Sequence, residues 1–167
     1  GIRENALFAI AEHGGDKVKD ILIDTAINSP DEELAEKAVF ALQDVKGGLG
    51  NDALLELMHK AKSPRTRRAV VLLMMDEKNG APVKVLAQVL KEESDPEIRQ
   101  QAVLALGETK SDEAVAALLE IAKGKDAKLA NAAVMALGQI GTPKAKAALL
   151  EVLETKRDTT SGPDKEG

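Results

Sequence analysis

DPEIRQQAVLALGETKSDEAVAALLEIAK, residues 95–123, is the stretch of sequence that decides the fold. Its second half contains AVAALLEIA, residues 114–122, in which apolar residues recur at spacings of three and four. This spacing gathers them on one side of an α-helix and does not fit the strict alternation of a strand. A first apolar segment, AVLAL, precedes it at residues 102–106. The stretch therefore predicts two helices, A and then B, joined by a short turn.

The same pattern recurs along the chain with a period of 32 residues, which shortens to 31 at the last step. The A-helix segments are LFAI (7–10), VFAL (39–42), VLLM (71–74), VLAL (103–106) and VMAL (134–137). A second apolar segment follows each of them about 15 residues later. Such a period indicates stacked supersecondary units that bury a continuous core. We therefore expect an all-α solenoid of about five antiparallel helix pairs.

The repeat boundaries follow from this register. We place the solenoid at residues 1–155, with repeats at about 1–28, 29–61, 62–92, 93–124 and 125–154. The remaining segment, 156–167, is polar and has few apolar residues, so we expect a tail without fixed structure. Because a helical pattern begins directly after Gly1, we interpret the chain as a piece of a longer protein.

Residues 95–123 and the following DAKLANAAVMALGQIGTPKAKAALLEVLE, 126–154, resemble bacterial HEAT repeats of the short, phycobilin-lyase-like type. The resemblance covers about residues 2–154 and is strongest in the fourth and fifth repeats. It implies a right-handed superhelix, with the A helices on the convex side and the B helices lining the concave side.

Glycines and capping residues predict where the helices end and begin. We expect a left-handed glycine after four of the A helices, at Gly14, Gly47, Gly107 and Gly138. Ser29 and Ser94 are each followed by Glu three residues later, which matches a capping box, and Thr142 precedes a proline. In the third repeat, residues 76–80 break the pattern and predict a different turn.

The composition argues against several classes of enzyme. The chain has no Cys, Trp or Tyr and only two histidines, so it lacks a thiolate zinc site, a cysteine nucleophile and an aromatic base-stacking surface. His13 and His59 fall at opposite ends of B helices, about 18 Å apart at 1.5 Å per residue. We expect no catalytic residue, no metal and no cofactor. A chromophore site like that of the phycobilin lyases is not visible in these residues.

An acidic column is the first candidate binding site. It occupies equivalent positions on the five B helices, at Asp24, Glu56, Gln88, Glu120 and Glu151. Asp20 and Asp52 repeat one turn earlier, so the first two repeats are doubly acidic. The column is either an ordinary solvated helix face or a groove that selects a basic protein segment. The resemblance places these positions on the concave side.

The segment HKAKSPRTRR, residues 59–68, carries five of the basic residues and joins the second repeat to the third. His59, Lys60 and Lys62 suit the C-terminus of a helix because of its dipole. Without this segment 18 bases and 28 acids remain, a charge of −10, so we do not expect nucleic-acid binding.

The arginines of this segment need separate explanations. Arg67 and Arg99 are one period apart, and the family resemblance implies inter-repeat pairs of Arg67 with Asp95 and of Arg99 with Asp126. Arg65 and Arg68 fall in the first turn of a helix, where the helix dipole disfavours cations. The local helix therefore does not explain why arginine is present at these two positions. The two arginines are candidates for a contact with a small anion or an acidic protein at one edge of the stack.

The sequence as a whole favours a non-enzymatic scaffold that binds a protein partner, and we expect a monomer without membrane contact in this part of the chain. Two alternatives stay open: a lyase-like or enzyme-accessory subunit, and a structural spacer in a larger bacterial protein. The sequence does not distinguish the bacterial cytoplasm from the cell envelope.

Overall fold

The computed structural model describes residues 15–45, 48–75 and 82–160, with side chains to residue 157, and within these ranges all regular structure is helical. The elements are α2 (Asp16–Asn28), α3 (Glu32–Ala41), the 3-10 turn η1 (Leu42–Asp44), α4 (Asn51–Lys60), α5 (Pro64–Met74), α6 (Val83–Glu92), α7 (Pro96–Glu108), the 3-10 turn η3 (Asp112–Ala114), α8 (Val115–Ala122), α9 (Ala127–Ile140) and α10 (Pro143–Thr160). The first A helix, Gly14, Gly47, His13 and the turn at 76–80 lie outside the described residues.

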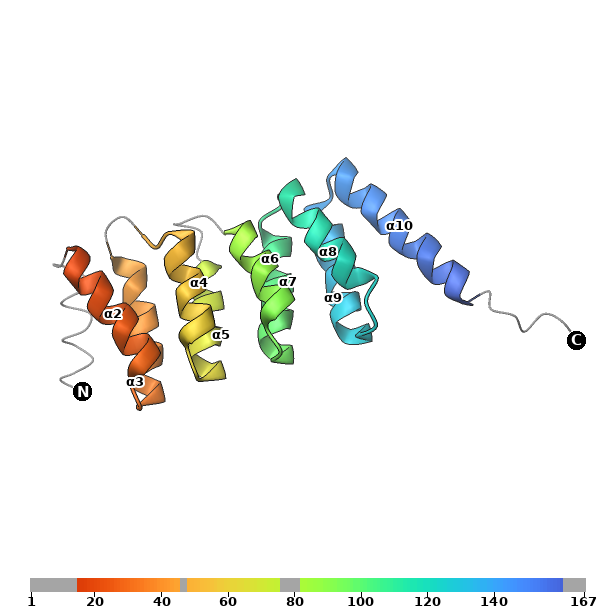
Figure 1. Ribbon diagram of the computed structural model, residues 1–167. Helices are drawn as coiled ribbons and strands as arrows, with labels where there is room; N and C mark the ends of the chain where they lie inside the picture. The colour runs from red at the N-terminus through yellow and green to blue at the C-terminus, as the bar shows by residue number, and fades with distance from the viewer. Residues whose placement is uncertain (1–14, 46–47, 76–81, 161–167) are drawn as a thin grey trace, which may run out of the picture.

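The helices form two layers (Figure 1). The A helices α3, α5, α7 and α9 contact one another in order, and the B helices α2, α4, α6, α8 and α10 form the second layer in front of them. Successive helices run antiparallel, so each repeat adds one helix to each layer. The predicted all-α solenoid of stacked helix pairs is confirmed.

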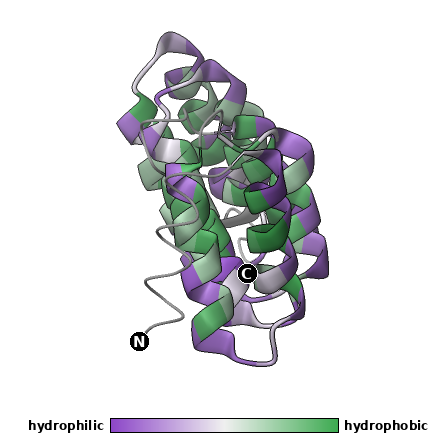
Figure 2. Ribbon diagram, turned by 90° about the vertical axis from the view of Figure 1, so that its left-hand side faces the viewer, coloured by the Kyte–Doolittle hydropathy of each residue, from purple (hydrophilic) through white to green (hydrophobic). Residues whose placement is uncertain are grey.

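The core lies between the two layers. Viewed along the stack, apolar residues gather where the layers meet (Figure 2). Leu57, Leu86 and Leu118 on successive B helices are fully buried, as are Ile98 and Leu106 on α7. Each such side chain stabilises the fold by about 1.5–3 kcal/mol relative to an exposed position. The core is continuous because every helix pair buries its apolar side against its neighbours.

The helix starts differ from the predicted capping boxes by one or two residues. Asp31 caps α3 and Asp95 caps α7, each accepting hydrogen bonds from two backbone N–H groups, whereas Ser29 and Ser94 precede the caps. The aspartate carboxylates directly precede the first helical residue, so they reach the free N–H groups of the first turn better than the serine hydroxyls that come before them. The Thr142 cap is confirmed, since its hydroxyl accepts from the N–H of Ala145 at 3.3 Å.

The predicted left-handed ends at Gly107 and Gly138 are wrong. Both residues lie inside helices, and α9 ends instead on Gly141, which has φ of 65°. Gly107 has a packing reason, because a Cβ there would lie 2.9 Å from the Cβ of Ala136 on α9. Glycine at this position lets α7 and α9 approach closely.

The last helix is longer than expected. α10 continues to Thr160, so it includes the first residues of the segment predicted as a polar tail. Lys, Arg and Glu are good helix formers, and they extend the helix beyond the part that packs on α9. Residues 161–167 lie outside the described ranges.

Candidate functional site

A hollow between α2 and α4 brings together three acids of the predicted column. It has a volume of about 380 Å³, and Asp20, Asp24 and Glu56 line it together with the apolar Ile23 and Ile27. Asp20 and Asp24 are one turn apart on α2, so their side chains lie on the same side of that helix. The hollow therefore has an acidic rim over an aliphatic floor.

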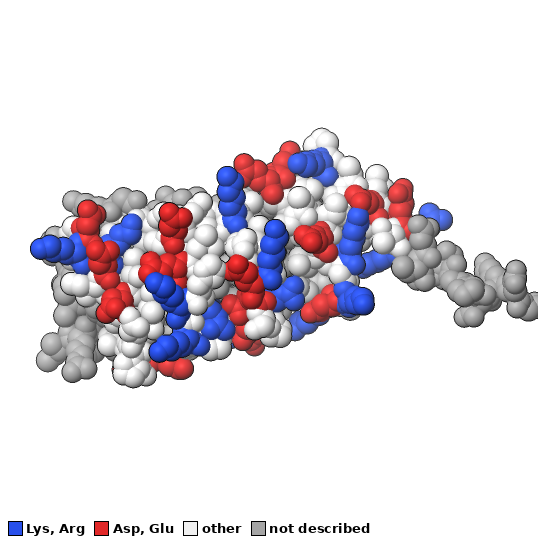
Figure 3. All heavy atoms as spheres, viewed as in Figure 1, with Lys and Arg blue, Asp and Glu red and all other residues white. Residues whose placement is uncertain are grey.

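The carboxylates of this hollow are only partly neutralised. Lys60 pairs with Glu56 at 3.0 Å within α4, and the side-chain amide of Asn28 donates to Asp24 at 2.8 Å. Among the described residues, neither Asp20 nor Asp24 forms an ion pair. Figure 3 shows acidic and basic side chains interspersed along this side of the molecule, over α2 and α4 as well as over α6 and α8. The acidic character is therefore local to the hollow, where three carboxylates and one cation, Lys60, are among the lining residues.

The other positions of the acidic column do not join this hollow. Asp52 and Glu120 are exposed on their helices. Gln88 donates to Glu92 on the same helix, and Glu151 on α10 pairs with Lys123 of the preceding repeat. The sequence predicted one continuous column, but internal partners occupy part of it in the later repeats.

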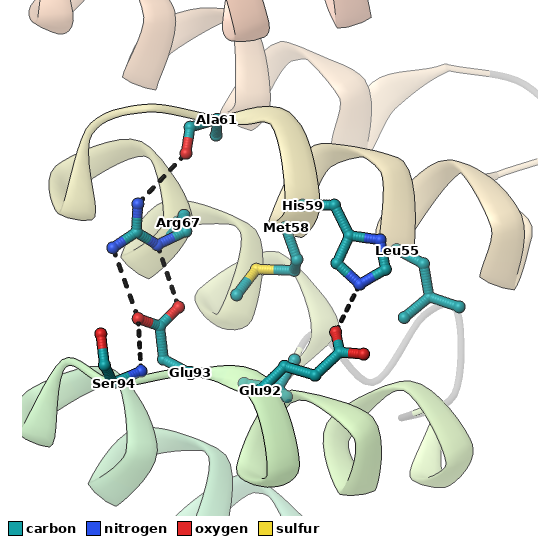
Figure 4. A pocket seen from close by; sticks show the side chains of 9 residues that line it. Leu55, Met58, His59, Ala61, Arg67, Glu92, Glu93 and Ser94 are labelled. Atoms are coloured by element: carbon teal, nitrogen blue, oxygen red, sulfur yellow. Dashed lines mark hydrogen bonds and ion pairs between the residues drawn. The ribbon is translucent and has the colours of Figure 1, made fainter.

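A second hollow, of about 260 Å³, lies between α4 and α6 and contains the basic segment's own pairs (Figure 4). Arg67 pairs with Glu93 at 2.9 Å and also donates to the carbonyl of Ala61 at 3.1 Å. The predicted pair of Arg67 with Asp95 is therefore wrong, because the Asp95 carboxylate caps α7.

The imidazole of His59 contacts Glu92 in the same hollow. The hydrogen bond from Gln88, together with the one to His59, lowers the pKa of Glu92 below its usual value. His59 is thus part of a contact between α4 and α6, in addition to its favourable place at the end of α4.

Arg99 has no carboxylate partner among the described residues. Its guanidinium donates to the carbonyl of Leu90 at 3.5 Å, its buried Nε is unpaired, and Asp126 caps α9 instead of pairing with it. The prediction of an Arg99–Asp126 pair is wrong. Arg67 pairs with Glu93, but the residue one period after Glu93 is Lys125. The position that would supply an acid to Arg99 is therefore occupied by a cation.

Arg65 and Arg68 have ion-pair partners inside the protein, and contact with a small anion or an acidic partner stays a prediction for them. Arg65 donates to both carboxylate oxygens of Glu36 on α3, at 2.6 and 3.2 Å, and this raises the pKa of Arg65. Arg68 pairs with Glu97 on α7. The two arginines thus connect α5 to the A helices on either side.

The spacing of charges in the sequence is a signal for these two ion pairs. Glu36 precedes Arg65 by 29 residues, and Arg68 precedes Glu97 by the same number, slightly less than one period. Opposite charges at that separation lie on adjacent A helices, one step along the stack. The basic segment is therefore a set of contacts between repeats.

Comparisons with known proteins agree with this geometry. Residues 83–160 match a family model described as HEAT repeats. A designed armadillo repeat protein, solved in complex with the peptide (KR)4, matches with a TM-score of 0.51 and 17% identity over 98% of this chain and 86% of its own. The fold is an α-solenoid like that of the armadillo repeat protein, and the match to HEAT repeats covers residues 83–160.

An engineered protein is also similar to this repeat protein, with 19% identity and a TM-score of 0.49 over 98% of this chain and 83% of its own. No curated protein matches the chain. Neither the HEAT-repeat model nor the designed armadillo repeat protein is described as catalytic. Stacked repeats of this type commonly present extended binding surfaces.

Two further properties bear on the chemistry of the repeat protein. In the described ranges, no three His, Asp or Glu side chains converge in a way that could hold a metal ion. No helix in those ranges combines the length and the hydrophobicity needed to cross a membrane.

Proposed function

We propose that this repeat protein is a non-enzymatic interaction scaffold whose α2–α4 hollow binds a basic segment of a partner protein. The observation that carries the proposal is the convergence of Asp20, Asp24 and Glu56 on one hollow, opposed there by the single cation Lys60. The short, phycobilin-lyase-like subtype of HEAT repeat remains part of this proposal and rests on the sequence resemblance alone.

The chemistry of the hollow favours a Lys or Arg side chain. The aliphatic floor of Ile23 and Ile27 suits the methylene stem of such a side chain, and the carboxylates at the rim suit its charged end. An exposed ion pair contributes at most about 1 kcal/mol, so the affinity requires several partner cations or several contacts. The acidic field also accelerates the approach of a basic partner at low ionic strength.

A protein of the same fold is known to hold a basic peptide, since the designed armadillo repeat protein was solved in complex with (KR)4. That likeness concerns the fold, and the proposal for this chain rests on its own carboxylates. It does supply a suitable probe, an eight-residue peptide of alternating Lys and Arg.

The test measures the affinity of this peptide, labelled with a fluorophore, by anisotropy at two salt concentrations. We expect the triple variant Asp20→Asn, Asp24→Asn, Glu56→Gln to bind about tenfold more weakly, which corresponds to about 1.4 kcal/mol. The dependence of the affinity on salt should also decrease, because fewer charges are screened.

The matched control neutralises three exposed acids elsewhere, at Glu108, Glu113 and Glu154, with Gln at each position. This variant has the same net charge as the first one. Equal weakening of binding in both variants would mean that the peptide responds to overall charge and not to the hollow. Unchanged binding in the first variant would also contradict the proposal.

A further inference from the structure

The carboxylate of Glu93 is bound by a set of donors at the junction of two repeats (Figure 4). Arg67 donates to it at 2.9 and 3.3 Å, and the backbone N–H groups of Ser94 and Asp95 donate to it at 3.2 and 3.1 Å. Asp95 also caps α7 with its own carboxylate, so a neighbouring acid does not prevent this binding. The junction shows which groups of the repeat hold a carboxylate.

Arg99 repeats the position of Arg67 at the next junction along the stack. It lies one period later, on α7, and it too donates to a carbonyl near the end of the preceding B helix, that of Leu90 on α6 at 3.5 Å. Its Nε is buried without a hydrogen-bond partner, although the side chain as a whole stays partly exposed. A buried donor of a charged group is unfavourable without an acceptor. Arg99 thus has the donors of Arg67 but, among the described residues, no carboxylate to receive them.

The turn before α9 repeats the backbone donors as well. Asp126 caps α9 in the way that Asp95 caps α7, so the N–H groups of Lys125 and Asp126 correspond to the two that hold Glu93. Within the described ranges, neither of these two N–H groups has an acceptor. Residues 123–125 read Lys-Gly-Lys, so this turn supplies no acid at the place of Glu93.

We propose that Arg99 and the turn at residues 124–126 bind a carboxylate group supplied from outside the chain. The carboxylate accepts from the guanidinium of Arg99 and from the N–H groups of Lys125 and Asp126, which correspond to the donors that hold Glu93 one repeat earlier. The exposed side chain of Lys125 adds a cation, and in the described ranges it forms no ion pair.

The chemistry of these donors favours a carboxylate. A planar guanidinium presents parallel N–H groups that match the two oxygens of a carboxylate, and neighbouring backbone N–H groups add further donors. The side chain of Asp126 is directed to the first turn of α9, where it accepts from the N–H of Leu129 at 3.1 Å. This site lies at the junction of α7, α8 and α9, so it is separate from the α2–α4 hollow and does not depend on the function of that hollow.

The test titrates the isotope-labelled native chain with sodium acetate and follows the backbone N–H signals by two-dimensional NMR, with sodium chloride at the same ionic strength as reference. The signals of Lys125 and Asp126 should shift and saturate in acetate but not in chloride. Those of Ser94 and Asp95 should not respond, because Glu93 already accepts from them. We expect a dissociation constant of about 1–10 mM, since a single carboxylate makes few contacts.

Lys125→Glu is the decisive variant, because it places an acid within reach of Arg99 and should not destabilise the fold. The acid competes with acetate, so the acetate response at Asp126 should weaken at least about tenfold. Lys146→Glu is the matched control, since it makes the same change in net charge at an exposed position on α10. This control should bind acetate as the native chain does.

A second ligand distinguishes the source of the carboxylate. A capped pentapeptide with Glu at its centre and Ala elsewhere is titrated in the same way as acetate. Tighter binding of the peptide than of acetate supports the site and identifies an acidic side chain of a partner protein as its ligand. Equal or weaker binding of the peptide, with a saturating response to acetate, supports the site and identifies a free small carboxylate.

Three results would overturn the proposal. The first is the absence of a shift at Lys125 and Asp126 with both acetate and the peptide. The second is an equal shift in chloride, which would show that the N–H groups respond to ionic strength alone. The third is the same acetate response in Lys125→Glu as in Lys146→Glu, which would place the binding of acetate elsewhere on the chain.

Discussion

Glu93→Gln tests how the repeats are joined, because Glu93 is the most enclosed partner of the basic segment. Its side chain is 6% exposed and that of Arg67 is 18% exposed. The carboxylate accepts two hydrogen bonds from Arg67, at 2.9 and 3.3 Å, and two from the backbone N–H groups of Ser94 and Asp95. Gln keeps the shape of the side chain but removes the charge and one acceptor.

The expected loss follows from burial. Breaking a buried ion pair costs about 3–5 kcal/mol because the remaining charge has no partner. Arg67 keeps its bonds to the carbonyls of Ala61 and Lys62 and has some access to water, so we expect a loss of about 2–3 kcal/mol. With a urea m-value of about 1–3 kcal/mol/M, the midpoint should fall by roughly 1 M.

Glu97→Gln is the matched control, since Glu97 on α7 pairs with Arg68, which lies on the same helix as Arg67. In that pair the side chains are 44% exposed for Arg68 and 70% exposed for Glu97, so the loss should stay below about 1 kcal/mol. Unfolding is followed by circular dichroism because the chain has no Trp or Tyr for fluorescence.

Equal losses in the two variants would refute the reasoning, because burial would then not determine the strength of the pair. A changed m-value in Glu93→Gln would instead show that the repeats no longer unfold together, as is common in repeat proteins whose interfaces are weakened.

Three further predictions use the same unfolding assay. Gly107→Ala should destabilise the protein by about 1–2 kcal/mol, since overpacking against Ala136 outweighs the gain in helix propensity; a stabilised variant would show that α7 and α9 can separate freely. Lys125→Glu should stabilise the protein by about 1 kcal/mol by offering Arg99 the acid that Arg67 already has, and an unchanged midpoint would count against that equivalence. The pKa of Glu92 lies below its usual 4.5, so its contacts stabilise the fold above that pH and are lost as the pH falls through the folded-state value. The Glu92→Gln variant should therefore lose less stability than the native chain when the pH falls from about 6 to about 3. Parallel profiles of stability against pH for the two proteins would contradict this prediction.

Much of the architecture was predictable because it depends on local spacing. Apolar residues at spacings of three and four predict helices, and the period of 32 residues predicts that they stack as pairs. Single residues at the helix ends were less predictable. Ser29 and Asp31, or Ser94 and Asp95, can all serve as caps, and the choice depends on which side chain reaches the free N–H groups in the folded backbone.

The sequence by itself determined that the chain is a stack of helix pairs and that acids gather on the first two B helices. Only the tertiary structure decided that Arg65 pairs with Glu36 and Arg67 with Glu93, that Asp20, Asp24 and Glu56 share one hollow, and that Gly107 lies against Ala136. The physical reason is reach. Periodicity fixes the direction of a side chain from its own helix, but a contact between repeats depends on how closely two helices approach and on how far long side chains extend across that distance.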